Sequence, residues 1–273
     1  MLSGLDIAGL NQDNRDVERN SDKKRVAQTE FFKSKELGQN AIDWIQRAII
    51  PLRPDETQSI TQSFGEEIKD GNKHVSARQL LNGVHEFKTR VFLHKDHPTQ
   101  VIKLYEYEND SLDVVFAYEA YIQDAAYRVS RDCGVQIPEV YAYGKYIPAN
   151  QNVFCFFIVM QKIDFTSLHD YLTKNAVHAI LCESIAAKIN EVNDCLNKNG
   201  IRHGDLNVGN IFINRRPDAN HRSDNPVDLA LIDFGQAGPS SPINLADENY
   251  SCDKIKRISN RLKTSFDAPA NVF

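Results

Sequence analysis

Two short segments in the last third of the chain carry the residues with the most specific chemistry. The first, 203–210, reads HGDLNVGN, and the second, 231–235, reads LIDFG. Asp205 is a carboxylate that can orient an attacking hydroxyl and accept its proton. Asn210 and Asp233 supply side-chain oxygens, the ligands that magnesium prefers. A carboxylate base beside a magnesium site matches the requirements of phosphoryl transfer from ATP.

A third group lies upstream, where Lys103 occupies the middle of the apolar segment 100–105. A lysine in such a strand is costly unless its charge is paired. We therefore expect Lys103 to bind the α- and β-phosphates and a carboxylate on the following helix. Glu119 is the best candidate for that carboxylate, and Asp113 and Asp124 are the alternatives. In this interpretation Lys103 serves both nucleotide binding and catalysis.

Taken together, these residues resemble those of the protein-kinase-like superfamily over roughly residues 77 to 240. Five of them occur in the order that the family requires: Lys103, Glu119, Asp205, Asn210 and Asp233. The resemblance implies an α+β, two-lobed protein-kinase-like fold with ATP and magnesium as cofactors. It also implies that 160–163 is the hinge whose backbone binds adenine, so Met160 and Lys162 become candidate nucleotide-binding residues.

Hydrophobic periodicity predicts the elements that must position these groups. Strands are expected over 90–93, 100–105, 139–146, 153–161, 210–213 and 228–232. Helices are expected over 112–126, 167–172, 178–199 and 253–266, with Gly200 ending the third of them. The helix over 253–266 has basic residues around an apolar face. It either closes the core or forms a basic docking surface for a partner or an anionic lipid.

The chain is expected to have three parts. Residues 1–75 form an N-terminal extension, partly disordered, with one amphipathic helix around 36–50. Residues 76–163 form a small β-rich N-lobe, and residues 164–273 form a reduced helical C-lobe. Nothing in the sequence indicates the oligomeric state.

The sequence departs from ordinary protein kinases at several positions. The expected glycine-rich loop over 82–88 holds Gly83 alone, and Gly204 stands where most protein kinases have an arginine. That arginine normally meets a phosphate in the activation segment, so its absence suggests an enzyme not switched by phosphorylation of its own loop. Asn207 replaces a lysine that usually meets the γ-phosphate. Little chain follows Gly235, too little for the usual platform that binds peptide substrates.

This shortened C-lobe resembles the minimal kinases that bacterial pathogens inject into host cells. The resemblance implies a cytoplasmic enzyme, delivered in that case into a host cell, with an activating protein partner. The first hypothesis is therefore an atypical minimal protein kinase acting on Ser or Thr of a protein. The alternatives are a small-molecule phosphotransferase of the aminoglycoside or choline kinase type, a pseudokinase-like binding module, and an enzyme that transfers AMP.

Composition excludes several other classes. A formal net charge of -5 argues against nucleic-acid binding as the main activity. The longest apolar run, 153–160, is eight residues long, whereas a membrane span needs roughly 20. The five cysteines contain no CxxC pair, and their odd number suggests reduced thiols in a cytosol-like compartment. Cys155, Cys182 and Cys195 are expected to be small core residues.

Overall fold

The computed structural model describes residues 54–74, 86–108, 112–147, 153–175, 179–215, 227–239 and 249–267. They form two compact units. The first contains the described residues up to Tyr121 together with Glu139–Lys162, and the second contains Ile122–Pro138 together with the described residues from Ile163 onward. The helix predicted over 36–50 and most of the loop predicted over 82–88 lie outside the described residues.

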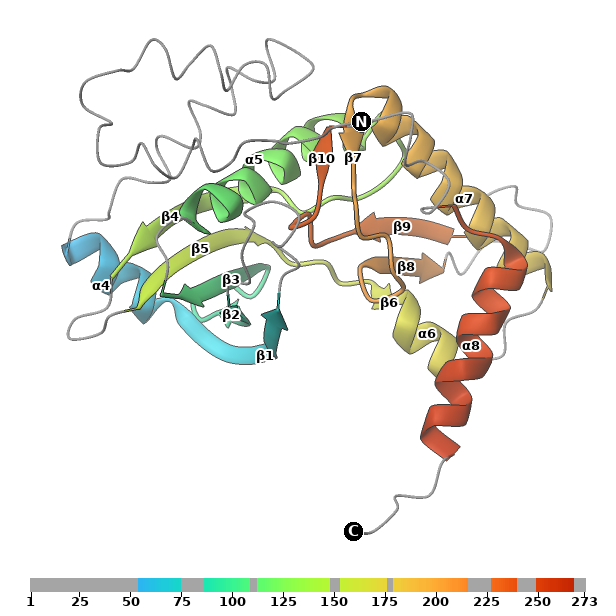
Figure 1. The fold of residues 1–273 in the computed structure, drawn as a ribbon, viewed down its shortest axis with the longest axis horizontal. Helices are drawn as coiled ribbons and strands as arrows, with labels where there is room; N and C mark the ends of the chain where they lie inside the picture. The colour runs from blue at the N-terminus through green and yellow to red at the C-terminus, as the bar shows by residue number, and fades with distance from the viewer. Residues whose placement is uncertain are drawn as a thin grey trace. The chain divides into compact units, whose positions relative to one another are not determined.

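The first unit is built on an antiparallel five-stranded sheet with the strand order β1-β2-β3-β5-β4 (Figure 1). Its strands are β1 (Phe64–His74), β2 (Glu86–His94), β3 (Gln100–Tyr107), β4 (Val140–Tyr146) and β5 (Phe154–Gln161). The sequence of β5 is almost wholly apolar, and all its residues except the two at its ends are buried. A strand flanked by β3 and β4 and covered on both faces requires such a sequence.

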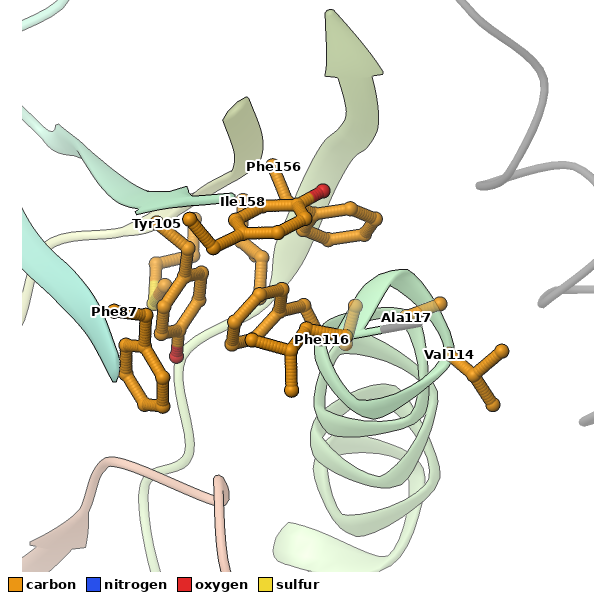
Figure 2. Packing of buried hydrophobic residues seen from close by; sticks show 11 residues of the cluster. Phe87, Tyr105, Val114, Phe116, Ala117, Phe156 and Ile158 are labelled. Carbon is orange, nitrogen blue, oxygen red and sulfur yellow. The ribbon is translucent and has the colours of Figure 1, made fainter. Parts of the chain in front are cut away.

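Side chains alternate between the two faces of this sheet, because successive residues of a strand point in opposite directions. On one face, Phe87, Tyr105 and Phe156 pack with Phe116 of helix α5 (Asp113–Ser130), as Figure 2 shows. The rings of Phe116 and Tyr105 stack with their centroids 4.0 Å apart. Burying one such side chain contributes about 1.5–3 kcal/mol, so this face fixes the start of α5 on the sheet. The other face carries a second cluster: Phe92, Ile102, Leu104, Tyr146, Cys155, Phe157 and Val159, with Ile60 of helix α4 (Pro54–Gln62) packed against it.

The sheet begins earlier than the sequence analysis predicts, since β1 and α4 fall inside the stretch 1–75 that was expected to be an extension. β1 reads FGEEIKDGNKH and pairs with β2 from Phe64 opposite His94 to His74 opposite Glu86. Because β1 is rich in charged residues, hydrophobic periodicity does not predict it. Charged residues suit an edge strand, which must resist pairing with other chains.

The second unit is mainly helical, and the α+β fold class predicted from the sequence is confirmed. Its helices are α6 (Leu168–Lys174), α7 (Ala179–Lys198) and α8 (Cys252–Asp267). A three-stranded sheet joins β6 (Thr166–Ser167), β8 (Ile211–Arg215) and β9 (Val227–Leu231), and a short ladder pairs β7 (Ile201–Arg202) with β10 (Gly238–Pro239). None of the described helices is long and apolar enough to cross a membrane.

Helix α8 packs within the second unit. Ile255 is fully buried, and the buried hydroxyl of Ser259 donates to the carbonyl of Leu172 in α6 at 3.1 Å. The ammonium of Lys263 donates to the carbonyl of Asn175, just beyond α6, at 3.1 Å. These contacts support the first of the two expectations for this helix, that it closes the core.

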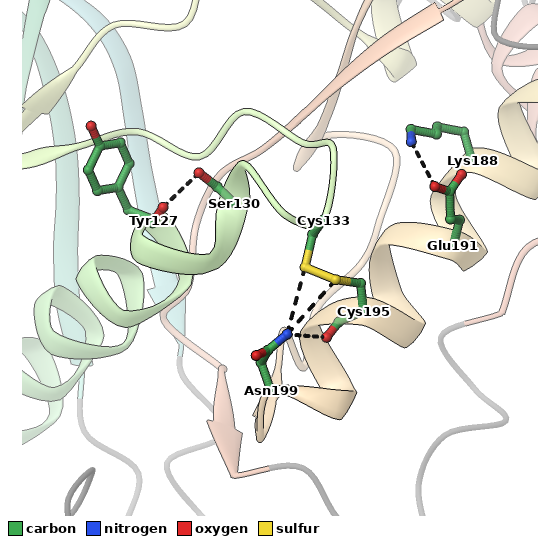
Figure 3. Close-up of a disulfide and its surroundings, with 7 residues drawn as sticks. All are labelled: Tyr127, Ser130, Cys133, Lys188, Glu191, Cys195 and Asn199. Atoms are coloured by element: carbon green, nitrogen blue, oxygen red, sulfur yellow. Dashed lines mark hydrogen bonds and ion pairs between the residues drawn. A yellow bond between two sulfur atoms is a disulfide. The ribbon is translucent and has the colours of Figure 1, made fainter.

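Two disulfides cross-link α7 to its neighbours. Cys133, in the loop after α5, pairs with Cys195 in α7 (Figure 3), and Cys182 in α7 pairs with Cys252 at the start of α8. The prediction of reduced thiols is therefore wrong for four of the five cysteines. Its premise, the odd number, fails because four cysteines form pairs and the fifth, Cys155, is a buried free thiol. Burial also raises the pKa of the Cys155 thiol to about 11, so this thiol is unreactive at neutral pH.

These pairings predict a specific thiol count. Without reductant, we expect a thiol-reactive dye to label no cysteine in the folded protein and one, Cys155, in the unfolded protein; after reduction, all five should react. The two bridges close loops of 62 and 70 residues, so each should stabilise the second unit by about 4 kcal/mol. Urea unfolding with and without reductant measures the loss. Three or more thiols in the unreduced, unfolded protein would contradict the pairing.

Candidate active site

The predicted Lys103–Glu119 pair is present in the first unit. The ammonium of Lys103 in β3 lies 2.6 Å from Oε1 of Glu119 in α5, and both side chains are more than nine-tenths buried. Tyr105, two residues further along the same strand, donates its hydroxyl to Oε2 of the same carboxylate. Glu119 is thus held by two donors from one strand. The alternative partners are engaged elsewhere, Asp113 with Lys145 and Asp124 with Arg128.

The segment predicted to bind adenine lies at the end of β5. Met160 is buried and pairs with Val101 of β3 and Val140 of β4. The backbone N–H of Lys162 donates to the carbonyl of Thr99 at 2.8 Å. An adenine that used the N–H of Lys162 would have to replace this hydrogen bond. The expectation for Met160 and Lys162 therefore remains a prediction.

In the second unit, Asp205 lies in the loop between β7 and β8, where two amides hold its carboxylate. Asn207 Nδ2 donates to Oδ1 at 2.9 Å, and Asn210 Nδ2 donates to Oδ2 at 3.1 Å. Asn207 is itself fixed, because its Oδ1 accepts from the N–H of Gly209 at 2.8 Å. Each carboxylate oxygen has two lone pairs and can still accept a second hydrogen bond. Asn207, which the sequence analysis noted only as a departure, thus orients the predicted base.

The buried Asn210 joins this loop to the segment that follows β9. Its Nδ2 also donates to the backbone carbonyl of Asp205 at 3.0 Å, and its own carbonyl accepts from the N–H of Ile232 at 3.0 Å. Strands β8 and β9 pair with Ile211 opposite Leu231. The ladder therefore brings Asn210 and Asp233 to the same end of the hairpin, as their predicted shared role requires.

Asp233 adopts a left-handed backbone conformation, with φ of 66°. Among the described residues it is the only one other than glycine to do so. Strained conformations of this kind cost about 1–3 kcal/mol and tend to persist at functional sites. The next residue, Phe234, is buried.

His203 is a buried residue that links the Asp205 loop to the segment after β9. It is fully buried, its Nε2 lies 3.0 Å from the carbonyl of Ile232, and its Nδ1 lies 3.4 Å from the N–H of Asp205. Because a carbonyl can only accept and an N–H can only donate, these neighbours fit a neutral imidazole with its proton on Nε2. The ring also packs on Phe234, with the centroids 4.6 Å apart. His203 therefore holds the two segments together and is not placed as a proton carrier.

Tyr250 is a supporting residue that the sequence analysis missed. It is buried, and its hydroxyl donates to the carbonyl of Leu206, next to Asp205, at 2.8 Å. Its backbone N–H donates to Oδ1 of Asn190 in α7 at 2.8 Å. Burial, and secondarily the negative charge of Asp205, raise the pKa of Tyr250 to about 12. The phenol thus remains a neutral donor throughout the physiological pH range.

We expect Tyr250→Phe to lower the free energy of unfolding by about 1–3 kcal/mol, because the carbonyl of Leu206 loses its donor. The raised pKa adds a pH signature. In the wild type, the contribution of this phenol is complete below pH 10, the ordinary pKa of tyrosine, and is lost as the pH rises towards 12. Urea unfolding of both proteins at pH 8 and pH 11 tests this. If the difference in free energy of unfolding between the two proteins is as large at pH 11 as at pH 8, the assignment is contradicted.

The donor set of the second unit suits magnesium bound together with a nucleotide. Asn210 directs its amide nitrogen to Asp205, which leaves its side-chain oxygen for another partner. Asp233 adds a carboxylate at the same end of the hairpin. In the described part of the chain, no three His, Cys, Asp or Glu side chains gather into a metal site. Magnesium commonly takes one or two protein oxygens and completes its shell with phosphates and water, so the residues fit such an ion.

The model of the lipopolysaccharide kinase (Kdo/WaaP) family matches residues 127–267, a span that includes the Asp205 loop, the Asp233 segment and Tyr250. No curated protein sequence matches the chain.

Solved structures also match the chain. Among them is the Rio2 kinase from Chaetomium thermophilum in its ADP/Mg²⁺-phosphoaspartate complex, with 17% identity and a TM-score of 0.43. The alignment covers 80% of this chain and 61% of that one, so the chain spans about three-fifths of the length of that kinase. The family model covers just over half of the chain, which therefore belongs to the lipopolysaccharide kinase (Kdo/WaaP) family.

Proposed function

We propose that the protein is a kinase, which transfers the γ-phosphate of ATP to a hydroxyl of a saccharide acceptor of the lipopolysaccharide type. One observation carries the proposal: the family match spans 127–267, where the carboxylate of Asp205 is held by two amide donors. A base needs a fixed orientation and a free lone pair to accept the proton of an attacking hydroxyl, and Asp205 has both.

The proposed roles of the other residues follow from their contacts. Lys103, fixed by Glu119, binds the α- and β-phosphates; this pairing is a recurrent element of kinase sites. Asn210 and Asp233 provide the oxygen ligands for magnesium, which neutralises phosphate charge when bound. Met160 and Lys162 contribute to adenine binding from the end of β5.

The acceptor is where this proposal departs from the first hypothesis, a Ser/Thr protein kinase with an activating protein partner. The family description names a lipopolysaccharide. After Gly235, the described chain consists of β10 and α8 with the residues next to them, and the buried Ser259 ties α8 to α6. Helix α8 is thus part of the core of the second unit. Phosphorylation of a protein is therefore treated as an alternative outcome of the transfer assay described next.

The test is a transfer assay with ATP labelled in the γ-phosphate and three acceptors: purified lipopolysaccharide, its delipidated oligosaccharide and a mixed protein extract. We expect label on the two saccharide acceptors, with release of ADP. Asp205→Asn is the inactive control, and Asp170→Asn, at the exposed start of α6, is the matched carboxylate control. Label on protein alone would overturn the proposed acceptor. Release of pyrophosphate in place of ADP would indicate AMP transfer and overturn the reaction.

We retain the predicted cytoplasmic location, in the cell of origin or in a host cell, because ATP is the phosphate donor in this proposal. The disulfides make that location testable, since the cytosol keeps most thiols reduced. Quenching cells with acid, then unfolding the protein in the presence of an alkylating reagent and counting the alkylated cysteines by mass spectrometry, reports the compartment. Five alkylated cysteines support the cytoplasm, and one, Cys155, places the protein in an oxidising compartment.

A further inference from the structure

A second buried ion pair lies on α5, beside the Lys103–Glu119 pair. The ammonium of Lys145 in β4 binds Oδ2 of Asp113, and both side chains are more than nine-tenths buried. The hydroxyl of Tyr107 donates to Oδ1 of the same carboxylate. The Lys145 ammonium also lies 4.4 Å from the ring centroid of Phe154. No role in phosphate transfer has so far been attached to this group, which we name the Asp113 anchor (Asp113, Lys145 and Tyr107).

The Asp113 anchor repeats the chemistry of the Glu119 site. In each, one carboxylate of α5 accepts from a tyrosine of β3 and from a strand lysine. The two tyrosines, Tyr105 and Tyr107, are two residues apart on β3 and so point to the same face of the sheet. The two carboxylates are six residues apart, about 9 Å along the helix axis. Helix α5 is therefore attached to the sheet by charge at two separate points.

The apolar contacts that α5 makes near these points offer little resistance to sliding. Phe116 stacks on Tyr105 with the centroids 4.0 Å apart, and Ala117 and Ala120 are fully buried. Ring stacking and alanine contacts tolerate small shifts, whereas hydrogen bonds to a carboxylate require defined distances and angles. Without the Asp113 anchor, Glu119 would be the attachment of α5 to the sheet by charge, and the next buried polar contact would be that of Gln123 with the carbonyl of Pro138 at 3.0 Å. The first turn of α5 could then still rotate about Glu119.

We infer that the Asp113 anchor is a positioning device, which fixes the first turn of α5 so that Glu119 meets Lys103 in the geometry that binds nucleotide. The inference rests on the proposed role of Lys103. Asp113 and Lys145 act through Glu119 and touch neither nucleotide nor acceptor. A buried ion pair is weak evidence for stability, since well-packed apolar residues often replace it at no loss. Such a replacement would keep the stability of the protein but would lose the fixed orientation of α5.

The test separates stability from orientation with two variants. Lys145→Met alone leaves the carboxylate of Asp113 buried without its cation and should destabilise the protein. The triple variant Asp113→Leu, Lys145→Met and Tyr107→Phe replaces the whole anchor by apolar groups and should recover most of that stability. If the anchor positions α5, the recovered protein still binds ATP with magnesium about tenfold more weakly than wild type, measured by isothermal titration calorimetry. Recovery of both stability and ATP affinity would overturn the inference.

Coupling to Glu119 gives a second criterion. In a Glu119→Gln background, the triple variant should weaken ATP binding no further, because the residue through which the anchor acts is already impaired. If the losses of ATP affinity in the two variants were additive, the anchor would not act through Glu119. Glu67→Gln is the matched control, since it breaks the ion pair between Glu67 of β1 and Arg90 of β2 in the same sheet without touching α5. ATP affinity should be unchanged in this control.

Hydrogen–deuterium exchange over 113–121 tests the anchor without nucleotide. We expect exchange about tenfold faster in the triple variant than in wild type, and no change in Glu67→Gln. Unchanged exchange over 113–121 would overturn the inference even if ATP affinity fell. A wild-type protein that fails to bind ATP would sink the proposed function, while the exchange comparison would still decide whether the anchor holds α5.

Discussion

Asp205→Asn should reduce phosphate transfer about a thousandfold, the middle of the range expected when a positioned base is removed. The substitution keeps the shape of the side chain but removes the charge that accepts the proton of the attacking hydroxyl. Its effect on stability should be small, about 1 kcal/mol. One of the two donors that now face the carboxylate, Asn207 or Asn210, would meet an amide nitrogen in place of an oxygen.

Nucleotide binding distinguishes this variant from a loss of the magnesium site. Asp205 is assigned to the acceptor hydroxyl, so Asp205→Asn should keep the stabilisation that ATP and magnesium give the wild type. That stabilisation is about 2.7 kcal/mol when ATP is present at a hundred times its dissociation constant. Asp233→Asn should lose both the stabilisation and the transfer. If Asp205→Asn retained a tenth or more of wild-type transfer, the assignment of the base would be wrong.

The sequence was sufficient for groups whose partners follow a fixed spacing on regular elements. Lys103 and Glu119 are sixteen residues apart on a strand and the next helix, and the structure joins them at 2.6 Å. The two strands around the Asp205 loop and the Asp233 segment were also predictable, because their apolar runs are short and bounded by polar residues. The hairpin register then brings Asn210 and Asp233 together.

Other features depend on tertiary contacts that leave no local pattern. Tyr250 reaches the carbonyl of Leu206 across 44 residues, and no periodicity connects those positions. For the same reason, the sequence did not indicate a role for Lys145. Its partner Asp113 was considered only as an alternative carboxylate partner of Lys103. The disulfides join cysteines 62 and 70 residues apart, and an odd cysteine count cannot reveal that the unpaired one is buried in another unit.

Gly204→Ala is the second substitution with a large expected effect. Gly204 has φ of +80°, which disfavours any side chain. In addition, a Cβ at this position would lie 2.0 Å from the carbonyl oxygen of Gln236 and 2.8 Å from its carbonyl carbon. Both atoms belong to the backbone, so the loop or the Gln236 segment would have to move. We expect a loss of about 3 kcal/mol or more in the free energy of unfolding.

Gly200→Ala is the control that isolates the clash. Gly200 also has φ of +80°, but a Cβ there meets no atom within 4 Å. Its substitution should therefore cost only the conformational strain, about 1 kcal/mol. Urea unfolding of both variants gives the difference, and equal losses would show that the approach of Gln236 to Gly204 is unimportant. Transfer activity should fall in Gly204→Ala but not in Gly200→Ala, since Gly204 directly precedes Asp205.

The same contact explains why the arginine of ordinary protein kinases is missing from this position. Any residue with a Cβ would meet Gln236, so Gly204→Arg should destabilise the protein at least as much as Gly204→Ala. The close approach is formed where β7 pairs with β10, with Arg202 opposite Gly238. This ladder brings the chain after the Asp233 segment back onto the Asp205 loop. If Gly204→Arg were no less stable than the wild type, the glycine would require another explanation.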